Sequence, residues 1–237
     1  DYEYDNIGMG AKTMRACDHQ AQRDVPVVQG LPESEQESGR YFDIINIADV
    51  FLLFDSAQYT ERDWRNRNRL MSRHGPKWLT IPVQRTKDSP IGQVHASNNT
   101  WRRRHWESIR HWYGTALYFK ELRPFFRELY LGSDETNLSQ INYSFIQAIC
   151  DLLSIRTRLL CETVNPVTRD KNGVILDLCD YFRADVYISG PAAKSYIDEG
   201  LFQRAGVGIQ WIEYSGYPEY QHRHGLPFVH QVSILDL

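Results

Sequence analysis

The chain carries two short apolar runs that are separated by a crowded polar stretch. Residues 49–55 (DVFLLFD) form an apolar run that ends in a carboxylate, and residues 77–83 (KWLTIPV) form a second run. Each run is long enough for a buried strand and too short for a helix. The pattern therefore predicts two strands with a polar loop between them.

Helix-like and strand-like segments alternate along the rest of the chain. Residues 101–113 place Trp101, His105 and Ile109 on one face at helical spacing, and residues 137–153 repeat an apolar stripe with Thr136 as the expected cap. Further helices are predicted over residues 41–48, 118–130 and 176–184, and strands over residues 157–161, 185–189 and 207–214. Such alternation is typical of an α/β fold with a parallel sheet, here with a helical cap from about residue 101 to residue 154.

The same local order of elements occurs twice. An amphipathic helix, an Ala-Asp-Val-aromatic step, a short apolar strand and a polar loop lead to Asp55 and, far downstream, to Ser189 and Gly190. In parallel α/β sheets, ligands bind at the carboxyl ends of the strands. We therefore expect the Asp55 loop and the Ser189–Gly190 loop to open on the same edge of the sheet.

The polar stretch between the first two strands is rich in arginine. Five arginines stand against only Glu61 and Asp63, and two asparagines and Trp64 lie among them. The arginines are Arg62, Arg65, Arg67, Arg69 and Arg73, and the asparagines are Asn66 and Asn68. Guanidinium groups suit carboxylates and phosphates, and amides both donate and accept hydrogen bonds. The stretch is interpreted as an anion-reading wall, with a solvated surface loop as the alternative.

Composition limits the class of protein. The net charge is -3 and the apolar content is 42%, which is ordinary for a globular protein and argues against a partner that is a nucleic acid. Four cysteines without C-x-x-C spacing indicate reduced thiols in a cytoplasmic protein. The sequence has no run of 18 apolar residues and no signal-peptide pattern, so no membrane span is expected.

Several motifs together resemble one family. They are Asp55-Ser-Ala-Gln-Tyr59, Arg62-Asp-Trp-Arg-Asn-Arg-Asn-Arg69, Gly75-Pro-Lys-Trp-Leu-Thr-Ile-Pro-Val83, the WRRRHW at residues 101–106, the DVYISGPAAKSY at residues 185–196 and the closing SILDL. The chain resembles the WbqC-like family of bacterial proteins over about residues 41 to 237. The resemblance implies a Rossmann-like, mostly parallel sheet flanked by helices and a place in O-antigen or other surface-polysaccharide biosynthesis.

The first 40 residues differ from the family pattern. Relatives open with a strand, a Gln-Pro and an aromatic loop, and here only Gln29 and the Gly39-Arg-Tyr-Phe42 end of that pattern are present. Residues 1–40 are therefore predicted to be a divergent or disordered N-terminal segment, from a diverged loop or from a faulty reading frame. Residues 41–237 are predicted to form one WbqC-like α/β domain, and its C-terminus is predicted to be clipped.

Two side chains are candidates for catalysis. Asp55 ends a core strand, where a carboxylate can act as a base, take a metal or pair with a nearby arginine. His105 is the second candidate, although a histidine between aromatic residues is more often a packing residue. His222, His224 and His230 lack the spacing of a metal site, so no metal is predicted and no cofactor is identified.

The Ser189-Gly190-Pro191 turn is a further candidate site. It follows a strand and opens a predicted helix, whose N-terminus would attract phosphate or carboxylate, with Lys194 one turn inside. A plain strand-to-helix turn with a capping serine is the alternative. The full set of predicted substrate-binding residues is Gln29, Gln58, Arg65, Asn66, Arg67, Asn68, Trp78, Ser189, Gly190, Lys194 and Tyr196.

These observations favour an enzyme over a binding protein. The hypothesis is a group transfer of the acyl or aminoacyl type on a nucleotide-activated substrate such as a nucleotide-sugar. A non-catalytic glycan-binding or scaffold subunit of the same pathway is the alternative, because no nucleophile motif is present. Contact with RNA or tRNA through the arginines at 102–104 and the arginine-rich stretch at 62–73 is a third hypothesis, and its mark is strong salt dependence.

Overall fold

The computed structural model describes most of the chain from residue 38 onward. It covers residues 12–14, 26–28, 38–61, 64–84, 89–162, 167–168, 170–213, 219–222, 225–229 and 232–236. For residues 12–14, 26–28, 38–40 and 162 it describes the backbone alone. The predicted binding residue Gln29 lies outside the described residues. No helix in the described part of the chain is long and apolar enough to cross a membrane.

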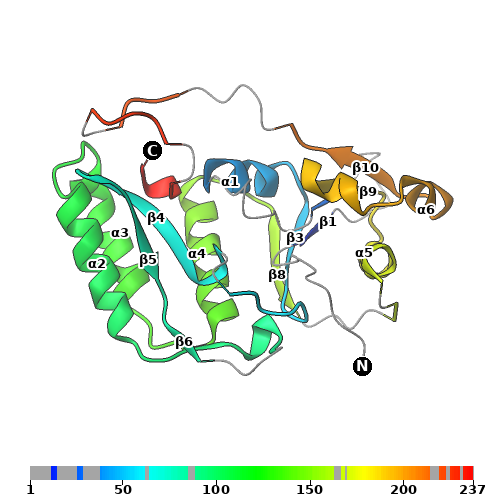
Figure 1. Cartoon of the computed structure of the whole chain (residues 1–237), viewed down its shortest axis with the longest axis horizontal. Helices are drawn as coiled ribbons and strands as arrows, with labels where there is room; N and C mark the ends of the chain where they lie inside the picture. Colours follow the sequence, from blue (N-terminus) through cyan, green and yellow to red (C-terminus); the bar gives the residue numbers. More distant parts are fainter. Residues whose placement is uncertain are drawn as a thin grey trace.

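Two three-stranded sheets form the centre of the fold (Figure 1). In the first, β3 (Val50–Phe54) pairs antiparallel with β1 (Lys12–Met14) and parallel with β8 (Arg158–Glu162). In the second, β9 (Val186–Ser189) lies parallel to both β2 (Pro26–Val28) and β10 (Gly208–Trp211). All five residues of β3 are buried, which fits an apolar run in a sheet that is covered on both faces.

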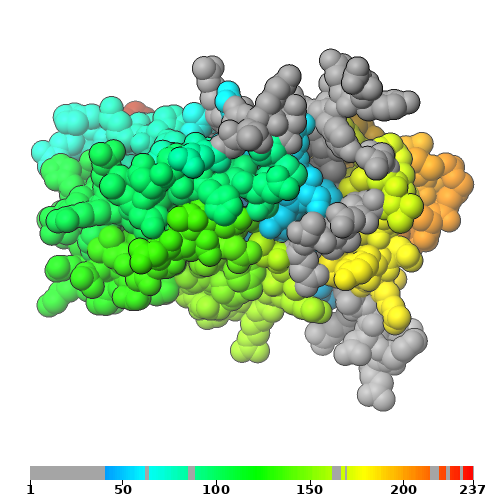
Figure 2. Space-filling view, turned by 90° about the horizontal axis from the view of Figure 1, so that it is seen from below, coloured from blue at the N-terminus to red at the C-terminus, as the bar shows by residue number. Residues whose placement is uncertain are grey.

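The helices gather at two ends of the molecule. Figure 1 shows α2 (Thr100–Tyr113), α3 (Phe119–Leu131) and α4 (Leu138–Leu152) at one end. At the other end, α5 (Lys171–Phe182) and α6 (Glu199–Arg204) lie near β9 and β10. Figure 2 separates the same two ends from a second direction. The remaining helix, α1 (Ser38–Asn46), leads into β3.

The mixed α/β class is confirmed, but the sheets are small and the Rossmann-like order is not confirmed. The predicted helices and strands occur with shifts of a few residues at their ends, except that a 3-10 turn stands where a helix was predicted after Gly190. One capping residue was predicted wrongly, because Asn137 and not Thr136 caps α4. The Asn137 side chain accepts a hydrogen bond from the backbone N–H of Gln140, which satisfies a donor of the first helical turn.

The largest error lies in the arginine-rich stretch. Residues 64–66 form a short 3-10 turn, η1 (Trp64–Asn66), and the following residues form β4 (Arg67–Ser72) and not a loop. β4 pairs antiparallel with β5 (Gly75–Thr80) in a separate two-stranded sheet. Charged residues obscured the strand, because a strand needs only one apolar face and its outer face can hold arginines.

The outer edge of β4 is held by side chains and by the C-terminal segment. The backbone N–H of Met71 donates to the hydroxyl of Tyr113 over 2.8 Å, and the N–H of Ser233 donates to the carbonyl of Arg69 over 2.7 Å. Two short pairs complete this part of the fold: β6 (Val83–Gln84) with β7 (His95–Ala96), and the 3-10 turn η2 (Ile91–Gln93) against the Asp55 turn.

A buried hydrogen-bond network fixes the C-terminal segment, which ends in the 3-10 turn η4 (Ile234–Asp236). The carboxylate of Asp236 accepts from the hydroxyls of Tyr113 and Tyr220, over 2.8 and 3.2 Å, and contacts Nδ1 of His222 at 2.5 Å. Nε2 of His222 accepts the backbone N–H of Val229, so the ring proton lies on Nδ1 and is donated to Asp236. His224 and His230 lie outside the described residues.

Asp236→Ala is expected to destabilise the protein by about 1–3 kcal/mol, because it leaves buried donors of His222 and Tyr113 without an acceptor. The measurement is the free energy of unfolding in urea. Asp180→Ala, a change of an exposed aspartate on α5, is the control and is expected to leave the stability nearly unchanged. Equal stabilities of the two variants would show that the network does not hold the C-terminal segment.

Candidate functional site

A cavity of about 280 Å³ lies under the β4–β5 sheet. Its walls come from α2, α3, α4, the end of β3 and the C-terminal turn η4. Apolar side chains form most of the lining, including Leu53, Leu70, Leu79, Phe145, Ile146 and Ile149. The polar side chains in the lining, other than aromatic ones, are Arg65, Asn66, Arg67, Asn68, His105, Asn142 and Ser233. An apolar cavity with a few convergent polar groups is the usual form of a small-molecule site.

The arginines and asparagines of β4 face two sides of the sheet. Side chains alternate along a strand, and the register pairs Arg69 with Trp78 and Asn68 with Leu79. Arg67, Arg69 and Trp78 therefore share the outer face, and Asn68 and Leu79 share the face that lines the cavity. Arg67, the first residue of β4, also borders the cavity. The arginine-rich stretch, which was interpreted as one anion-reading wall, is thus divided between a charged outer face and a polar rim of the cavity.

The outer face is a stack of guanidinium groups and indole rings. The guanidinium carbon of Arg67 lies 4.2 Å from the ring centre of Trp78, and that of Arg69 lies 5.2 Å from it. The rings of Trp64 and Trp78 are 4.8 Å apart. Burial lowers the pKa of Arg69, and the neighbouring charge of Arg67 lowers it further. An anion bound on this face would relieve the repulsion between the two cations.

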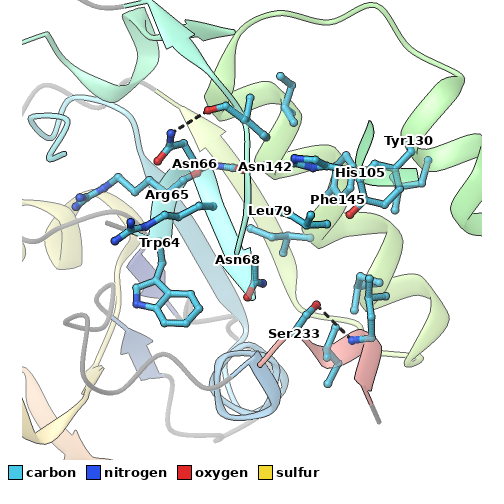
Figure 3. Close-up of a pocket in the computed structure, with 18 of the residues that line it drawn as sticks. Trp64, Arg65, Asn66, Asn68, Leu79, His105, Tyr130, Asn142, Phe145 and Ser233 are labelled. Atoms are coloured by element: carbon cyan, nitrogen blue, oxygen red, sulfur yellow. Dashed lines mark hydrogen bonds between the residues drawn. The ribbon is translucent and has the colours of Figure 1, made fainter. Parts of the chain in front are cut away.

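Arg65 and Asn66, the two residues before β4, form hydrogen bonds with other segments of the chain. The side-chain amide of Asn66 donates to the carbonyl of Ile81 over 2.9 Å, and the carbonyl of Arg65 accepts from the Asn142 amide over 2.9 Å. The Arg65 guanidinium donates to the hydroxyl of Thr60. In Figure 3, Arg65 extends away from His105, on the side of the cavity where Trp64 lies.

His105 lines the cavity from α2 and holds the free edge of β5. Its Nε2 lies 3.1 Å from the carbonyl of Thr80, which can only accept, so Nε2 carries the proton and Nδ1 is an acceptor. Burial lowers the pKa of His105 to about 4, against a smaller effect of the Thr80 bond. The imidazole is therefore neutral at neutral pH, which makes His105 an acceptor of hydrogen bonds and a poor general acid.

Asp55 lies in a buried polar cluster at the carboxyl ends of β3 and β8. Its carboxyl group accepts hydrogen bonds from the Ser139 hydroxyl and, over 3.3 Å, from the Cys161 thiol. Burial raises the pKa of Asp55, and these two bonds lower it by less. None of the described arginines pairs with Asp55, so the arginine-pairing alternative does not apply within the described structure. Asp55 does not line the cavity, but Leu53, two residues earlier, does.

The same cluster changes the interpretation of the cysteines. Cys150, Cys161 and Cys179 form no disulfide bond with one another, and Cys17 lies outside the described residues. Cys161 has a polar setting, because its sulfur lies 3.3 Å from both the Ser139 hydroxyl and the Gln140 amide. Burial chiefly raises the pKa of Cys161 to about 11, so the thiol is protonated at rest.

Helix α4 connects the Asp55 cluster to the cavity. Ser139 lies in its first turn, Asn142 reaches Arg65 at the cavity rim, and Phe145 and Ile149 line the interior. A helix rises 1.5 Å per residue, so Asn142 lies about 4.5 Å along the axis from Ser139, and Ile149 about 10 Å further. The helix thus places a carboxyl group, a polar rim and an apolar interior in that order.

The remaining predicted site residues lie away from this cavity. Ser189 is buried, and Gly190 precedes a five-residue 3-10 turn, η3 (Pro191–Ser195), in place of the predicted helix. Lys194 lies over the ring of Trp211 at 5.4 Å. Since β3 and β9 belong to different sheets, the expected common edge of the two loops is not part of this cavity.

Three other predicted residues also lie outside the lining. Gln58 forms an isolated β-bridge with Pro90, and the backbone carbonyl of Tyr196 accepts from Asn172 over 3.0 Å. Trp78 is 42% exposed on the outer face of β5. Of the predicted set, the cavity therefore includes Arg65, Asn66, Arg67, Asn68 and His105.

Sequence reasoning missed Trp101, Tyr130 and Asn142 as lining residues. The aromatic residues were interpreted as packing residues of helices, and the stripe of α4 was interpreted as core. Asn142 next to Ile141 was the available signal, because an amide beside a core stripe needs a partner. Within the described residues, no group of three or more His, Cys, Asp or Glu side chains could hold a metal ion.

Comparisons with known proteins extend over all the residues that line the cavity. A family model described as the WbqC-like protein family matches residues 39–237. The chain is also similar to an uncharacterized protein of Mycobacterium tuberculosis, Rv1507c, with 37% identity over 199 residues that cover 83% of this chain and 86% of the relative. No solved structure matches the chain significantly.

The buried neutral state of His105 predicts a pH dependence of stability. The unfolded chain takes up a proton near pH 6.5, whereas the folded chain does so near pH 4, so stability falls as the pH falls through this window. The effect is on the order of 3 kcal/mol at its full extent. In urea unfolding at pH 7.5, 6, 5 and 4.5, His105→Gln is expected to show a shallower fall than the wild type. Identical slopes would contradict the assignment of a buried neutral imidazole.

Proposed function

The chain belongs to the WbqC-like protein family, and we propose that it is an enzyme of bacterial surface-polysaccharide biosynthesis that transfers an acyl-type group from a nucleotide-activated donor. The pathway rests on the resemblance to the family. The observation that carries the reaction class is the apolar cavity of about 280 Å³ beside a guanidinium–indole face. Apolar walls favour an acyl or aryl group, and a sugar would leave its hydroxyls without partners there.

The proposed donor spans two regions around β4. Its acyl group occupies the cavity between Leu79 and Phe145, and its phosphates lie at Arg67 and Arg69 on the outer face. The exposed ring of Trp78 offers a stacking surface for a nucleobase. Lys194, a predicted substrate-binding residue, is not part of this proposal, because it packs on Trp211 and does not line the cavity.

Asp55 is the proposed base. The acceptor's hydroxyl or amine transfers its proton to the Asp55 carboxylate as its oxygen or nitrogen forms a bond to the acyl carbon. The bond from that carbon to the leaving thiolate or phosphate breaks, and the leaving group takes the proton from Asp55. A carboxyl group whose pKa is raised by burial accepts a proton more readily than an exposed one.

A glycan-binding subunit without catalysis is the second candidate. The observation that favours it is the exposed Trp78 ring beside Trp64, since a flat indole face also stacks on sugar rings. The two candidates differ in what occupies the cavity. A glycan-binding subunit needs only the outer face, whereas the transferase needs the apolar interior as well.

The acyl proposal predicts a dependence of affinity on chain length. In titration calorimetry with coenzyme A thioesters from acetyl to octanoyl, each added methylene is expected to lower the Kd about fourfold until the cavity is filled, at about 0.8 kcal/mol per methylene. Leu79→Trp fills the cavity and is expected to abolish the dependence on chain length. Arg67→Ala is expected to weaken binding of every thioester by the same factor.

Two outcomes of this titration count against the proposal. Affinities that do not change with chain length would show that the cavity holds no acyl group. Binding of free oligosaccharides that Trp78→Ala abolishes, without any response to the thioesters, UDP-sugars or dTDP-sugars, would favour the glycan-binding subunit.

Asp55→Asn is expected to leave the binding of thioesters intact. It is expected to lower the rate at which the acyl group is transferred to an amino-sugar acceptor, with release of coenzyme A, by about 10²–10⁴-fold, as for the loss of a general base. Asp43→Asn, on the exposed side of α1, is the matched control. The readout is the free thiol of released coenzyme A. An unchanged rate in Asp55→Asn would remove Asp55 from the mechanism.

A further inference from the structure

One wall of the cavity holds three polar groups whose hydrogen-bonding capacity is not satisfied by the described residues. His105 is 7% exposed, and its Nδ1 has no partner, because only Nε2 bonds to Thr80. The hydroxyl of Tyr130, a residue 8% exposed, has no hydrogen bond within the described structure. The indole N–H of Trp101 is buried and unpaired among the same residues.

These three side chains lie together. The ring centre of His105 is 5.1 Å from that of Trp101 and 6.2 Å from that of Tyr130, and Trp101 and Tyr130 are 6.4 Å apart. All three line the cavity. Of the three groups, only the indole N–H is fully enclosed without a partner. Nδ1 of His105 and the hydroxyl of Tyr130 belong to residues that line the cavity and have no protein partner among the described residues, so a group of a bound ligand can pair with them.

We propose that the group bound in this cavity is an apolar acyl or aryl group that carries a hydroxyl, which donates to Nδ1 of His105 and accepts from the hydroxyl of Tyr130. The proposal rests on the transferase proposed above and names its substrate class. A hydroxyl is the group that fits, because the wall offers one fixed acceptor, Nδ1 of His105, beside one hydroxyl donor, Tyr130. His105 is then a specificity-determining residue that selects hydroxylated donors.

The wall excludes charged groups as well as fully apolar ones. Burial keeps His105 neutral and raises the pKa of Tyr130, so neither side chain offers a charge to an incoming carboxylate or ammonium. A charged group would be buried there without a counter-ion, which is strongly unfavourable. A plain hydrocarbon would leave the imidazole and the phenol unpaired, and sites of this kind reject analogues that lack the hydroxyl.

The position of this wall also determines which end of the ligand carries the hydroxyl. Figure 3 shows His105, Tyr130 and Phe145 on one side of the cavity and Arg65 and Trp64 on the other. The anionic part of the donor is assigned to the arginine side. The hydroxyl therefore lies at the end of the acyl or aryl group that is remote from the activated carbonyl.

The test compares two probes that differ in one remote hydroxyl, 3-phenylpropanoate and 3-(4-hydroxyphenyl)propanoate. Titration calorimetry at pH 7 on the full chain is expected to give a Kd about tenfold lower for the hydroxylated probe. His105→Gln retains a donor for Thr80 but no acceptor at the position of Nδ1, and is expected to lose the preference. His105→Asn places its amide oxygen near that position and is expected to restore part of it.

Tyr130→Phe and a control variant complete the design. Tyr130→Phe is expected to reduce the preference without affecting binding of 3-phenylpropanoate. His111→Gln changes an exposed residue of α2, the helix that also carries His105, and is expected to leave both Kd values unchanged. Circular dichroism verifies that each variant is folded. Because Tyr130→Phe tests the same wall independently, the proposal remains testable if a His105 variant does not fold.

The outcomes separate this inference from the proposed function. Equal affinities of the two probes for the wild type would overturn the hydroxyl proposal, show that ordered water satisfies the wall, and leave the apolar acyl pocket in place. Binding of neither probe, together with no response to chain length among the thioesters, would overturn both. A preference that persists in His105→Gln and in Tyr130→Phe would overturn the assignment of the hydroxyl to this wall.

Discussion

The cavity depends on the β4–β5 sheet, which is held at both of its edges by hydrogen bonds from two side chains and from the backbone of the C-terminal segment. Tyr113 and the C-terminal Ser233 bind the edge of β4, and His105 binds the edge of β5 at Thr80. These contacts hold β4 and β5 over α2 and α4. Among the described strands, neither is hydrogen-bonded to a strand of the central sheets. A fully laddered strand would lie directly on the sheet, whereas edge contacts from long side chains leave a space beneath it.

The same contacts determine the chemistry of that space. Since the Thr80 carbonyl can only accept, the bond that secures β5 also fixes the tautomer of His105 and leaves Nδ1 of this cavity-lining residue as an acceptor. Burial then keeps the imidazole neutral. The C-terminal turn contributes Ser233 to the lining, and Asp236 holds that turn through Tyr113 and His222. Stability of the sheet and selectivity of the cavity thus depend on the same few bonds.

The sequence supported some of these conclusions and not others. The buried strand that ends before Asp55 and the helices α2 and α4 follow from apolar periodicity, which depends on neighbours along the chain. β4 was missed because its arginines stand on the solvent face. The cavity was missed because the apolar stripe of α4 looks identical whether it packs on a core or lines a hollow. The tautomer of His105 depends on Thr80, 25 residues away, and no local pattern reports it.

The central claim is that a ligand's apolar part binds between β5 and α4, and nuclear Overhauser contacts to bound 3-phenylpropanoate test it most directly. The account predicts contacts from the ring protons of the probe to Leu79 and Phe145, because both side chains line the cavity. Contacts confined to the exposed Trp78, or to the region of Lys194 and Trp211, would contradict it.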